Sequence, residues 1–436
     1  MKLRIEKAVY GGSGLARQSD GGDAGRTVFV PFALPGELVE ARVTGAKDGF
    51  AEAALLKVQE ASGDRVTPRC AHFGVCGGCQ YQHAEYGAQV GMKVGILVET
   101  LERAGLAGLP EVQVHTGEAW GYRNRVRLRI SVTDGALRVG YSRRGSNEFL
   151  AVRECPISAP LLWCATAALV EIGGEDSAAG RWVRSAEEVE FFSTGDEKKL
   201  QATVFVRKER VGGFDDFCER LRAAVPELVG AGVSLVAKEA ASRSSRRARP
   251  VQGWGAEGLS YAAADEAYWV SRGGFFQVNR FLVDELVRVV TEGRTGALAW
   301  DLYAGVGLFS RALARGFAQV VAVEAAGEDL VGSFKGKGRR GVSASTAEFL
   351  RGAIVQRERP ELVVMDPPRA GVGAEVCDLL VRVSPREMVY VSCDPVTLAR
   401  DLKRLVAGYR VAELHIVDLF PQTFHLETVV VLRKAT

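Results

Sequence analysis

The sequence predicts a protein of three domains, in which a small N-terminal β-barrel and a central α+β domain precede a Rossmann-like, doubly wound α/β domain. The chain has 436 residues, which is too long for a single hydrophobic core. Short β-type runs separated by glycine-rich turns fill residues 3–58. Beyond residue 274, uniformly apolar strands alternate with helical segments, as in parallel sheets buried on both faces. We therefore expect domains over residues 1–61, 62–274 and 275–436.

The composition is that of a globular protein without membrane segments. Hydrophobic residues make up 47% of the chain and charged residues 25%, which excludes a mostly disordered or fibrous protein. No apolar run approaches the roughly 18 residues that a membrane-spanning helix needs. The N-terminal segment carries Lys2, Arg4, Glu6 and Lys7, where a signal peptide would require an apolar core. We expect a monomeric cytoplasmic protein with no membrane partner.

The N-terminal region contains strand signals and no helical ones. Thr27–Val30 and Leu38–Val43 are β-type runs, and Gly11–Gly14 is a glycine-rich turn. Short strands joined by such turns are typical of a small β-barrel. In the central region, by contrast, the pattern predicts a helix over residues 86–104 and a second helical stretch over 161–172. The central region is therefore expected to be mixed α+β.

A basic strand pair concentrates charge that the whole chain does not have. The formal net charge is only +3, yet residues 123–144 contain seven arginines and one aspartate, a net of +6. At the period of a strand, one face carries Arg123, Arg125, Arg127 and Arg129. Asp134-Gly135 offers the turn to the return strand. Two interpretations remain, a solvated arginine face and, which we favour, a strip that contacts an RNA backbone.

A second basic patch, residues 242–250, is weaker evidence for a contact with RNA. It contains Arg243, Arg246, Arg247 and Arg249. The sequence does not decide between a hairpin tip that contacts phosphates and a loop without a partner.

Clustered cysteines predict a metal centre. Cys70, Cys76 and Cys79 form a Cys-x5-Cys-x2-Cys run with glycines between them, and Cys155 is a candidate fourth ligand from a distance. Four thiolates suit a 4Fe-4S cluster or a structural zinc, and the ligand set alone does not separate the two. His72 and His83 are further candidate zinc ligands, whereas unligated buried cysteines are the third alternative. For Cys164, Cys218 and Cys377 we expect packed thiols without a ligand.

Four apolar strands organise the C-terminal region: Ala297–Trp300, Val320–Val323, Leu362–Met365 and Met388–Val391. Asp301–Gly307 follows the first strand in an Asp-x3-Gly-x-Gly pattern, and Glu324 closes the second. Glycines let a backbone approach a nucleotide, and an acid about 20 residues onward can accept from ribose hydroxyls. Because a third glycine is missing, the pattern favours S-adenosylmethionine over a dinucleotide, with a glycine-rich turn that binds nothing as the alternative.

Reactive residue types follow the remaining strands. Asp366–Arg369 ends one strand and Ser392–Pro395, with Cys393, ends the next. Both motifs therefore fall at the carboxyl ends of strands, where sheets of this kind bind ligands. Glu427 stands at the mouth of the last strand, where it is either a surface glutamate or part of the same site.

Together these motifs resemble the RNA uracil-5-methyltransferases, in particular the iron–sulfur type that modifies a uridine of 23S ribosomal RNA. The N-terminal stretch resembles a TRAM domain, an OB-like RNA-binding barrel. Residues 275–279, 301–307, 366–369, 392–401 and 425–428, with Glu324, match the cofactor and catalytic motifs of that family. The four cysteines Cys70, Cys76, Cys79 and Cys155 match its 4Fe-4S ligands in spacing.

The resemblance implies a mechanism and named roles. Cys393 would be the nucleophile that adds to carbon 6 of uracil, and Glu427 the base that removes the carbon 5 proton. S-adenosylmethionine would supply the methyl group. The resemblance implies that four residues hold it: Gln277, Tyr303, Glu324 and Asp366. The partner implied is RNA, with 23S ribosomal RNA favoured and transfer RNA as the same-chemistry alternative.

Some positions depart from the family pattern. Leu308 stands where asparagine is common, Thr346 where an acid often meets the adenine, and residues 325–342 form a shorter segment. These departures put the affinity for the cofactor in doubt. They keep open an RNA-binding iron–sulfur protein without activity, whereas a nicotinamide oxidoreductase is disfavoured by the missing glycine.

Overall fold

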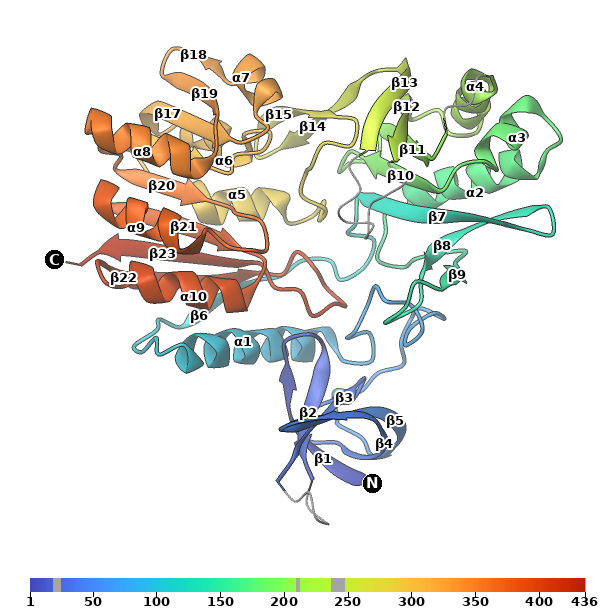
Figure 1. The fold of residues 1–436 in the computed structure, drawn as a ribbon, viewed down its shortest axis with the longest axis horizontal. Helices are drawn as coiled ribbons and strands as arrows, with labels where there is room; N and C mark the ends of the chain where they lie inside the picture. The colour runs from blue at the N-terminus through green and yellow to red at the C-terminus, as the bar shows by residue number, and fades with distance from the viewer. Residues whose placement is uncertain (19–24, 209–211, 237–247, 436) are drawn as a thin grey trace. The chain divides into compact units, whose positions relative to one another are not determined.

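The chain forms two compact units in the computed structural model, which describes residues 1–18, 25–208, 212–236 and 248–435 (Figure 1). The first unit contains residues 1–117 and 285–436, and the second contains residues 118–284. The second unit is therefore an insertion into the first. Of the second basic patch, Arg243, Arg246 and Arg247 lie outside the described residues.

A closed five-stranded barrel opens the first unit, as the glycine-punctuated sequence predicted. Its strands are β1 (Lys2–Val9), β2 (Ser13–Arg17), β3 (Thr27–Pro31), β4 (Leu38–Lys47) and β5 (Phe50–Glu60), in the order β1-β2-β3-β5-β4. Alternate residues point inward, and the small core includes Leu3, Ile5, Val28 and Val39. Closure removes the exposed edges that a short sheet would otherwise present.

A nine-stranded sheet forms the body of the first unit, in the order β18-β19-β17-β16-β20-β21-β23-β22-β6. Its strands are β6 (Val112–His115), β16 (Gly296–Leu302), β17 (Phe317–Glu324), β18 (Lys335–Gly336), β19 (Arg339–Ser343), β20 (Leu362–Met365), β21 (Glu387–Ser392), β22 (Tyr409–Val417) and β23 (Thr428–Lys434). From β19 to β21 neighbouring strands are parallel, whereas β23 runs antiparallel to β21. The expected doubly wound α/β domain is confirmed.

Helices alternate with these strands. They are α1 (Tyr86–Arg103), α5 (Val283–Thr291), α6 (Leu308–Leu313), α7 (Glu328–Ser333), α8 (Thr346–Gln356), α9 (Gly373–Val383) and α10 (Pro395–Leu405). Helices α8, α9, α10 and α1 pack side by side, and their apolar residues share one core with the sheet (Figure 1). Leu97 and Leu101 of α1 are fully buried there. The compact units thus divide the chain differently from the expected domains, because residues 62–117 pack within the first unit.

The second unit is built on a seven-stranded sheet in the order β13-β12-β11-β10-β7-β8-β9. Its strands are β7 (Arg125–Thr133), β8 (Ala136–Ser142), β9 (Phe149–Ala151), β10 (Glu188–Ser193), β11 (Leu200–Val206), β12 (Leu228–Val236) and β13 (Ala248–Gly255), with a separate hairpin of β14 (Gly258–Ala263) and β15 (Glu266–Ser271). Helices α2 (Pro160–Gly174), α3 (Ala178–Val183) and α4 (Phe214–Ala224) share its hydrophobic core. Mixed α+β structure is what the sequence predicted for this part.

The basic strand pair forms β7 and β8, but neighbouring carboxylates offset part of its charge. Arg125 and Arg127 project from the face of β7 opposite to the buried Val126 and Leu128. On β10, Glu190 lies 3.1 Å from Arg125 and Glu188 lies 2.7 Å from Arg127. Cross-strand partners of this kind are invisible to a local charge count, so the strip is less basic than its sequence indicates.

Among the three cysteines expected to be packed, Cys218 and Cys377 are buried and Cys164 is not. Cys164 lies on the exposed side of α2, between the buried Leu162 and Ala165. The prediction for Cys164 was wrong because α2 is apolar enough that hydropathy does not identify its outer face.

Candidate active site

The candidate site lies at the carboxyl edge of the parallel strands. Strand β16 pairs with β17 on one side and β20 on the other, so the order of the sheet reverses between β16 and β20. Open α/β sheets bind ligands at such a reversal. Asp301 lies in β16 beside Val364, and Asp366 follows the last residue of β20. Both acids therefore stand at the topological position where a ligand is expected.

The loop after β16 has the backbone of a ligand-binding turn. Tyr303, Gly305 and Gly307 have φ angles of +64°, +54° and +85°. Gly305 donates its backbone N–H to Glu324 Oε2 at 3.0 Å, which ties the loop to the end of β17. Only glycine adopts such angles without cost, and Tyr303 is therefore held in a conformation that its neighbours must stabilise.

Two buried or partly buried acids, Asp301 and Asp366, stand at this edge. Asp301 is fully buried and accepts a hydrogen bond from Ser310, and burial together with the nearby Glu324 raises its pKa to about 7. Asp366 keeps some exposure, yet loss of water around the carboxyl and the charge of Asp301 raise its pKa as well. A site that holds several carboxyl groups away from water favours a cationic ligand.

Cys393 and Glu427 lie side by side at the same edge. Ser392, which ends β21, pairs with Thr428, which begins β23. Paired residues of antiparallel strands are about 5 Å apart, so Cys393 and Glu427 follow and precede a directly facing pair. Burial raises the pKa of Cys393 to about 12, with further contributions from Glu427 and Asp366. Burial and Asp366 also raise the pKa of Glu427, which is only 4% exposed.

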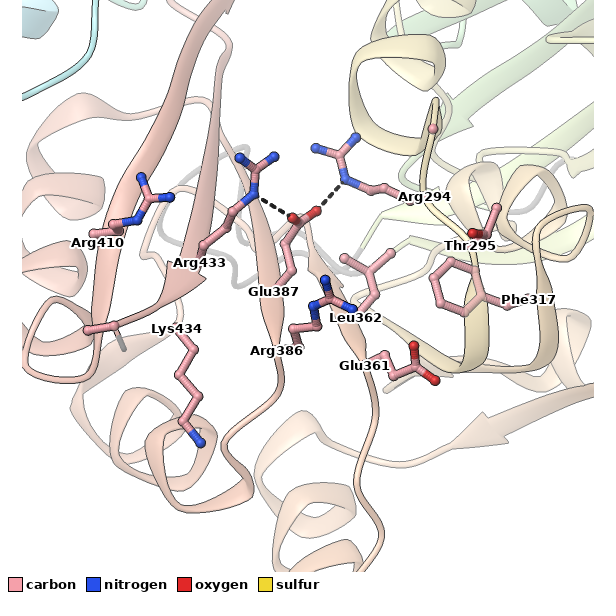
Figure 2. Close-up of a pocket in the computed structure, with 12 residues that line it drawn as sticks. Arg294, Thr295, Phe317, Glu361, Leu362, Arg386, Glu387, Arg410, Arg433 and Lys434 are labelled. Atoms are coloured by element: carbon pink, nitrogen blue, oxygen red, sulfur yellow. Dashed lines mark hydrogen bonds and ion pairs between the residues drawn. The ribbon is translucent and has the colours of Figure 1, made fainter.

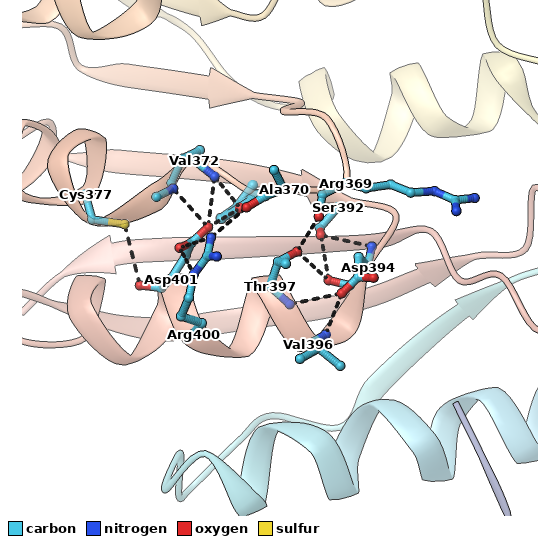
Figure 3. A network of polar contacts seen from close by, with 12 residues as sticks. Arg369, Ala370, Val372, Cys377, Ser392, Asp394, Val396, Thr397, Arg400 and Asp401 are labelled. Atoms are coloured by element: carbon cyan, nitrogen blue, oxygen red, sulfur yellow. Dashed lines mark hydrogen bonds and ion pairs between the residues drawn. The ribbon is translucent and has the colours of Figure 1, made fainter. Parts of the chain in front are cut away.

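A polar network fixes the turn that carries Cys393 (Figure 3). Asp394 caps α10 by accepting from the backbone N–H groups of Val396 and Thr397, each at 3.0 Å. Thr397 donates to the carbonyl of Arg369 at 3.0 Å. These contacts join the turn after β21 to the segment after β20.

Asp401 completes that network from inside α10. Its Oδ2 accepts from the Tyr390 hydroxyl at 2.8 Å and from the backbone N–H of Val372 at 2.9 Å, and Arg400 binds its other oxygen. The carboxylate of Asp401 is fully buried. Sequence reasoning included Asp401 only as part of a motif and did not find this supporting role.

Tyr10, which follows the first strand of the barrel, contacts both the turn after β21 and the loop before β23. Tyr10 donates its hydroxyl to Asp394 Oδ2 at 3.2 Å. Its ring packs edge-on against Phe424, with the centroids 5.3 Å apart. Residues 10 and 394 are too far apart in the chain for any sequence pattern to predict this contact.

The loop before β23, residues 418–427, rests on α1. Lys93 donates to Asp418 Oδ1 at 2.6 Å and to the carbonyl of Phe420 at 2.9 Å, and both charged side chains are buried. Gln89 and Gln422 exchange two hydrogen bonds of 3.0 and 2.9 Å. Gln422 has a φ of +69°, a strained conformation that these bonds maintain.

The cysteine-bearing segment also supports this loop. The backbone N–H groups of Gln80 and Tyr81, directly after Cys79, both donate to the Gln422 carbonyl at 3.0 Å. Within the segment, Gly78 N–H points at Cys76 Sγ at 3.4 Å. The cysteine run and the loop that carries Glu427 are therefore joined by backbone contacts.

No metal centre is assembled among the described residues. No group of three or more His, Cys, Asp or Glu side chains in that part of the chain is arranged to hold an ion. Cys70, Cys76 and Cys79 are partly exposed in the first unit, and Cys155 belongs to the second. His83, a candidate zinc ligand, is buried against Phe73 and Phe32, and burial lowers its pKa to about 4.

The remaining cofactor candidates are divided between the units. Tyr303, Glu324 and Asp366 come together at the sheet edge, whereas Gln277 lies in the second unit. There Gln277 is buried, and its backbone carbonyl accepts from Asn124 at 3.0 Å. Of the positions that depart from the family pattern, Leu308 begins α6 and Thr346 begins α8, and both are buried.

Comparison with known proteins places the chain among RNA methyltransferases. Residues 1–56 match the TRAM domain model and residues 345–435 match the model described as tRNA (Uracil-5-)-methyltransferase. A 23S rRNA (uracil(1939)-C(5))-methyltransferase RlmD of Chromohalobacter salexigens is 33% identical over 100% of this chain and 89% of that protein. The chain belongs to the RNA uracil-5-methyltransferase family. An uncharacterized RNA methyltransferase of Aquifex aeolicus is also 33% identical, over 99% of this chain and 98% of that one.

A solved structure supports the methyltransferase fold. The tRNA (uracil-54, C5)-methyltransferase of Pyrococcus abyssi, in complex with S-adenosyl-L-homocysteine, aligns with a TM-score of 0.74 at 22% identity. The alignment covers 99% of this family member and all of that chain. The N-terminal barrel agrees with the TRAM assignment. None of the helices in the described ranges combines the length and hydrophobicity needed to cross a membrane.

Proposed function

We propose that this chain transfers a methyl group from S-adenosylmethionine to carbon 5 of a uridine in RNA. The observation that carries the proposal is the pairing of Ser392 with Thr428, which sets Cys393 and Glu427 next to each other. Both lie at the sheet edge that also holds the Tyr303–Gly307 loop. The proposed nucleophile, base and cofactor loop would thus share one site.

The residues at the edge fit the proposed cofactor. Its sulfonium is a cation, and the buried acids Asp301 and Asp366 favour positive charge. Glu324 would accept from the ribose hydroxyls, Tyr303 would lie along the cofactor, and Asp366 and Gln277 would complete the site. When bound, S-adenosylmethionine supplies an electrophilic methyl group.

Cys393 would begin the chemistry. Carbon 5 of uracil is a weak nucleophile, and addition of a thiolate to carbon 6 gives it enolate character. The thiol must first lose its proton, which the surrounding acids oppose because they raise the pKa of Cys393. Reduced negative charge around the sulfur in the complete complex would therefore favour the thiolate.

Glu427 would complete the reaction. After methylation, carbon 5 carries one hydrogen that must leave as a proton before Cys393 is expelled and the ring is restored. Because burial and Asp366 raise the pKa of Glu427, its carboxylate is a stronger base than an exposed glutamate. Cys393 directly follows β21 and Glu427 directly precedes the adjacent β23, so both would reach one ring without rearrangement of the sheet.

Two substitutions test these roles. We expect Cys393→Ala to abolish methyl transfer to RNA, and Glu427→Gln to accumulate a covalent RNA adduct because proton removal fails. Methyl transfer is followed with a radiolabelled cofactor, and the adduct is detected as a band of reduced mobility on a denaturing gel. Normal turnover by either variant would contradict its assigned role.

For the RNA substrate we propose 23S ribosomal RNA. The full-length similarity to a 23S rRNA enzyme supports this choice over transfer RNA, which is the substrate named for the Pyrococcus relative. Parallel assays with a 23S fragment and a transfer RNA transcript discriminate the two. Labelling of the transfer RNA alone would overturn the ribosomal choice while leaving the chemistry intact.

We also propose that Cys70, Cys76, Cys79 and Cys155 hold a 4Fe-4S cluster. The all-thiolate donor set fits such a cluster, and the Gly78 N–H directed at Cys76 Sγ is the kind of contact that stabilises cluster sulfurs. Visible absorption with iron, sulfide and zinc analysis of anaerobically purified protein tests this. Stoichiometric zinc without iron would overturn it.

A further inference from the structure

A basic cavity opens at the edge of the sheet where β20 and β21 begin, opposite to the candidate active site. Figure 2 shows the residues that line it. It measures about 670 Å³ and lies entirely within the first unit. The side chains that line it include Arg294, Arg386, Arg410, Arg433 and Lys434, against the acids Glu361 and Glu387. These residues carry a net charge of +3, as much as the whole chain.

The topology separates this cavity from the catalytic residues. Leu362 and Glu387 begin β20 and β21, whereas Asp366 and Cys393 follow the other ends of those strands. Strands of four to six residues at about 3.3 Å per residue place the two edges roughly 13–20 Å apart. The cavity is therefore a second site and no part of the first.

Some basic side chains of the cavity form ion pairs with an acid, whereas others are exposed and could bind an anion. Glu387 lies between Arg294, at 2.8 Å, and Arg433, at 3.0 Å, which orders both guanidinium groups (Figure 2). Arg386, Arg410 and Lys434 are exposed and make no ion pair with the described residues. Their charges remain available to an anion, and Leu362 and Phe317 add apolar side chains to the lining of the cavity.

We propose that this cavity binds backbone phosphates of the RNA substrate, outside the segment that enters the active site. Guanidinium groups bind phosphate oxygens in a bidentate manner, and the cavity is several times larger than one phosphate group, as a nucleotide chain requires. The inference rests on the proposed function for the identity of the ligand. RNA held at both edges of the sheet would gain affinity and orientation without any change in the chemistry.

The test compares the double variant Arg386→Gln/Arg410→Gln with the control Lys403→Gln, which removes an exposed charge of α10 outside the lining of this cavity. Binding of a labelled 23S fragment to the full chain is measured by fluorescence anisotropy over a range of salt. Removal of one side chain that neutralises a phosphate lowers the slope of log K against log salt by about 0.7 to 0.9. We expect the double variant to bind roughly tenfold more weakly at low salt and to show a slope smaller by about 1.5. Arg386→Lys/Arg410→Lys should restore most of the slope.

Each result of this binding test leads to a different conclusion about the cavity. An unchanged slope in the double variant, or an equal decrease in Lys403→Gln, would overturn the proposal. If ATP or pyrophosphate binds the wild type, fails to bind the double variant and leaves RNA binding unaffected, the cavity serves a small phosphorylated ligand instead. The methylation rate at saturating RNA should stay normal in the double variant. Failure of the wild type to methylate any RNA would refute the proposed function, whereas the comparison of salt slopes would still decide the role of the cavity.

Discussion

At the scale of single residues, acids decide how the site behaves. Asp301, Asp366 and Glu427 all have raised pKa values because the fold removes water from their carboxyl groups. The same surroundings keep the Cys393 thiol protonated in the free protein. The thiol is therefore a weak nucleophile in these surroundings, because the thiolate is the reactive form.

The reactivity of Cys393 should report this control. At pH 8 we expect slow alkylation of Cys393 by iodoacetamide, with a rate that rises as the pH increases towards its pKa of about 12. Burial favours the neutral form of Glu427, and only its ionised form raises the pKa of Cys393, so Glu427→Gln should accelerate alkylation more at pH 10 than at pH 8. Peptide-resolved mass spectrometry measures the rate, and the exposed Cys164 is the internal reference. Equal alkylation rates for the two cysteines at pH 8 would contradict the raised pKa of Cys393.

Asp401 illustrates a residue that acts through others. Removal of its carboxylate leaves the Tyr390 hydroxyl and the Val372 N–H buried without their acceptor. We expect Asp401→Ala to lower the free energy of unfolding by about 2–4 kcal/mol, measured by urea denaturation. Asp401→Asn keeps an acceptor oxygen and should cost less; equal losses would mean that the hydrogen bonds are not responsible.

At the scale of elements, α1 supports the loop before β23, residues 418–427. Its boundaries were predictable from sequence, because apolar residues recur at helical spacing from residue 86 onward. What it supports was not predictable, because Lys93 and Gln89 meet partners more than 300 positions away. The helix therefore links the region that carries the cysteine run to the loop that carries Glu427.

The buried pair of α1 can be tested against an exposed one. Lys93→Met leaves Asp418 charged and buried, so we expect a loss of about 3–5 kcal/mol of unfolding free energy. Lys7→Met breaks the partly exposed ion pair between Lys7 of β1 and Glu99 of α1. It should lower the free energy of unfolding by less than about 1 kcal/mol. Urea denaturation followed by circular dichroism measures both, and Lys93→Met/Asp418→Leu should recover part of the loss. Similar effects of the two lysine substitutions would contradict the argument from burial.

At the scale of the whole molecule, the second unit is inserted between two neighbouring points of the first. His115 and Glu285 flank the insertion, and their side chains hydrogen-bond at 2.5 Å. Arg288 also binds Glu285, and His415 packs beside His115 with a 3.1 Å contact between ring nitrogens. The entry and exit of the inserted chain are thus held together within the first unit.

The contacts of Glu285 with His115 and Arg288 predict that stability depends on pH. Arg288 and His115 lower the pKa of Glu285 to about 2, so its contribution is present above the ordinary pKa of about 4.5 and lost as the pH falls towards 2. We expect Glu285→Gln to lower stability by about 1–2 kcal/mol at pH 7, allowing for partial exposure. The difference from wild type, measured by urea denaturation, should shrink between pH 4.5 and 2. A difference that stays constant over that window would rule out the charge of Glu285 as its cause.

Local pattern determined much of this protein. The barrel, helix α1, the buried parallel strands and the placement of Cys393 and Glu427 at strand ends all follow from periodicity and turn residues that act over a few positions. Only the tertiary structure decided the rest: Tyr10 against Asp394, Glu188 and Glu190 beside the arginines of β7, residues 62–117 within the first unit, and the exposure of Cys164. The physical reason is that these features depend on which surfaces meet, and the partners of a surface leave no mark on the residues next to it in the chain.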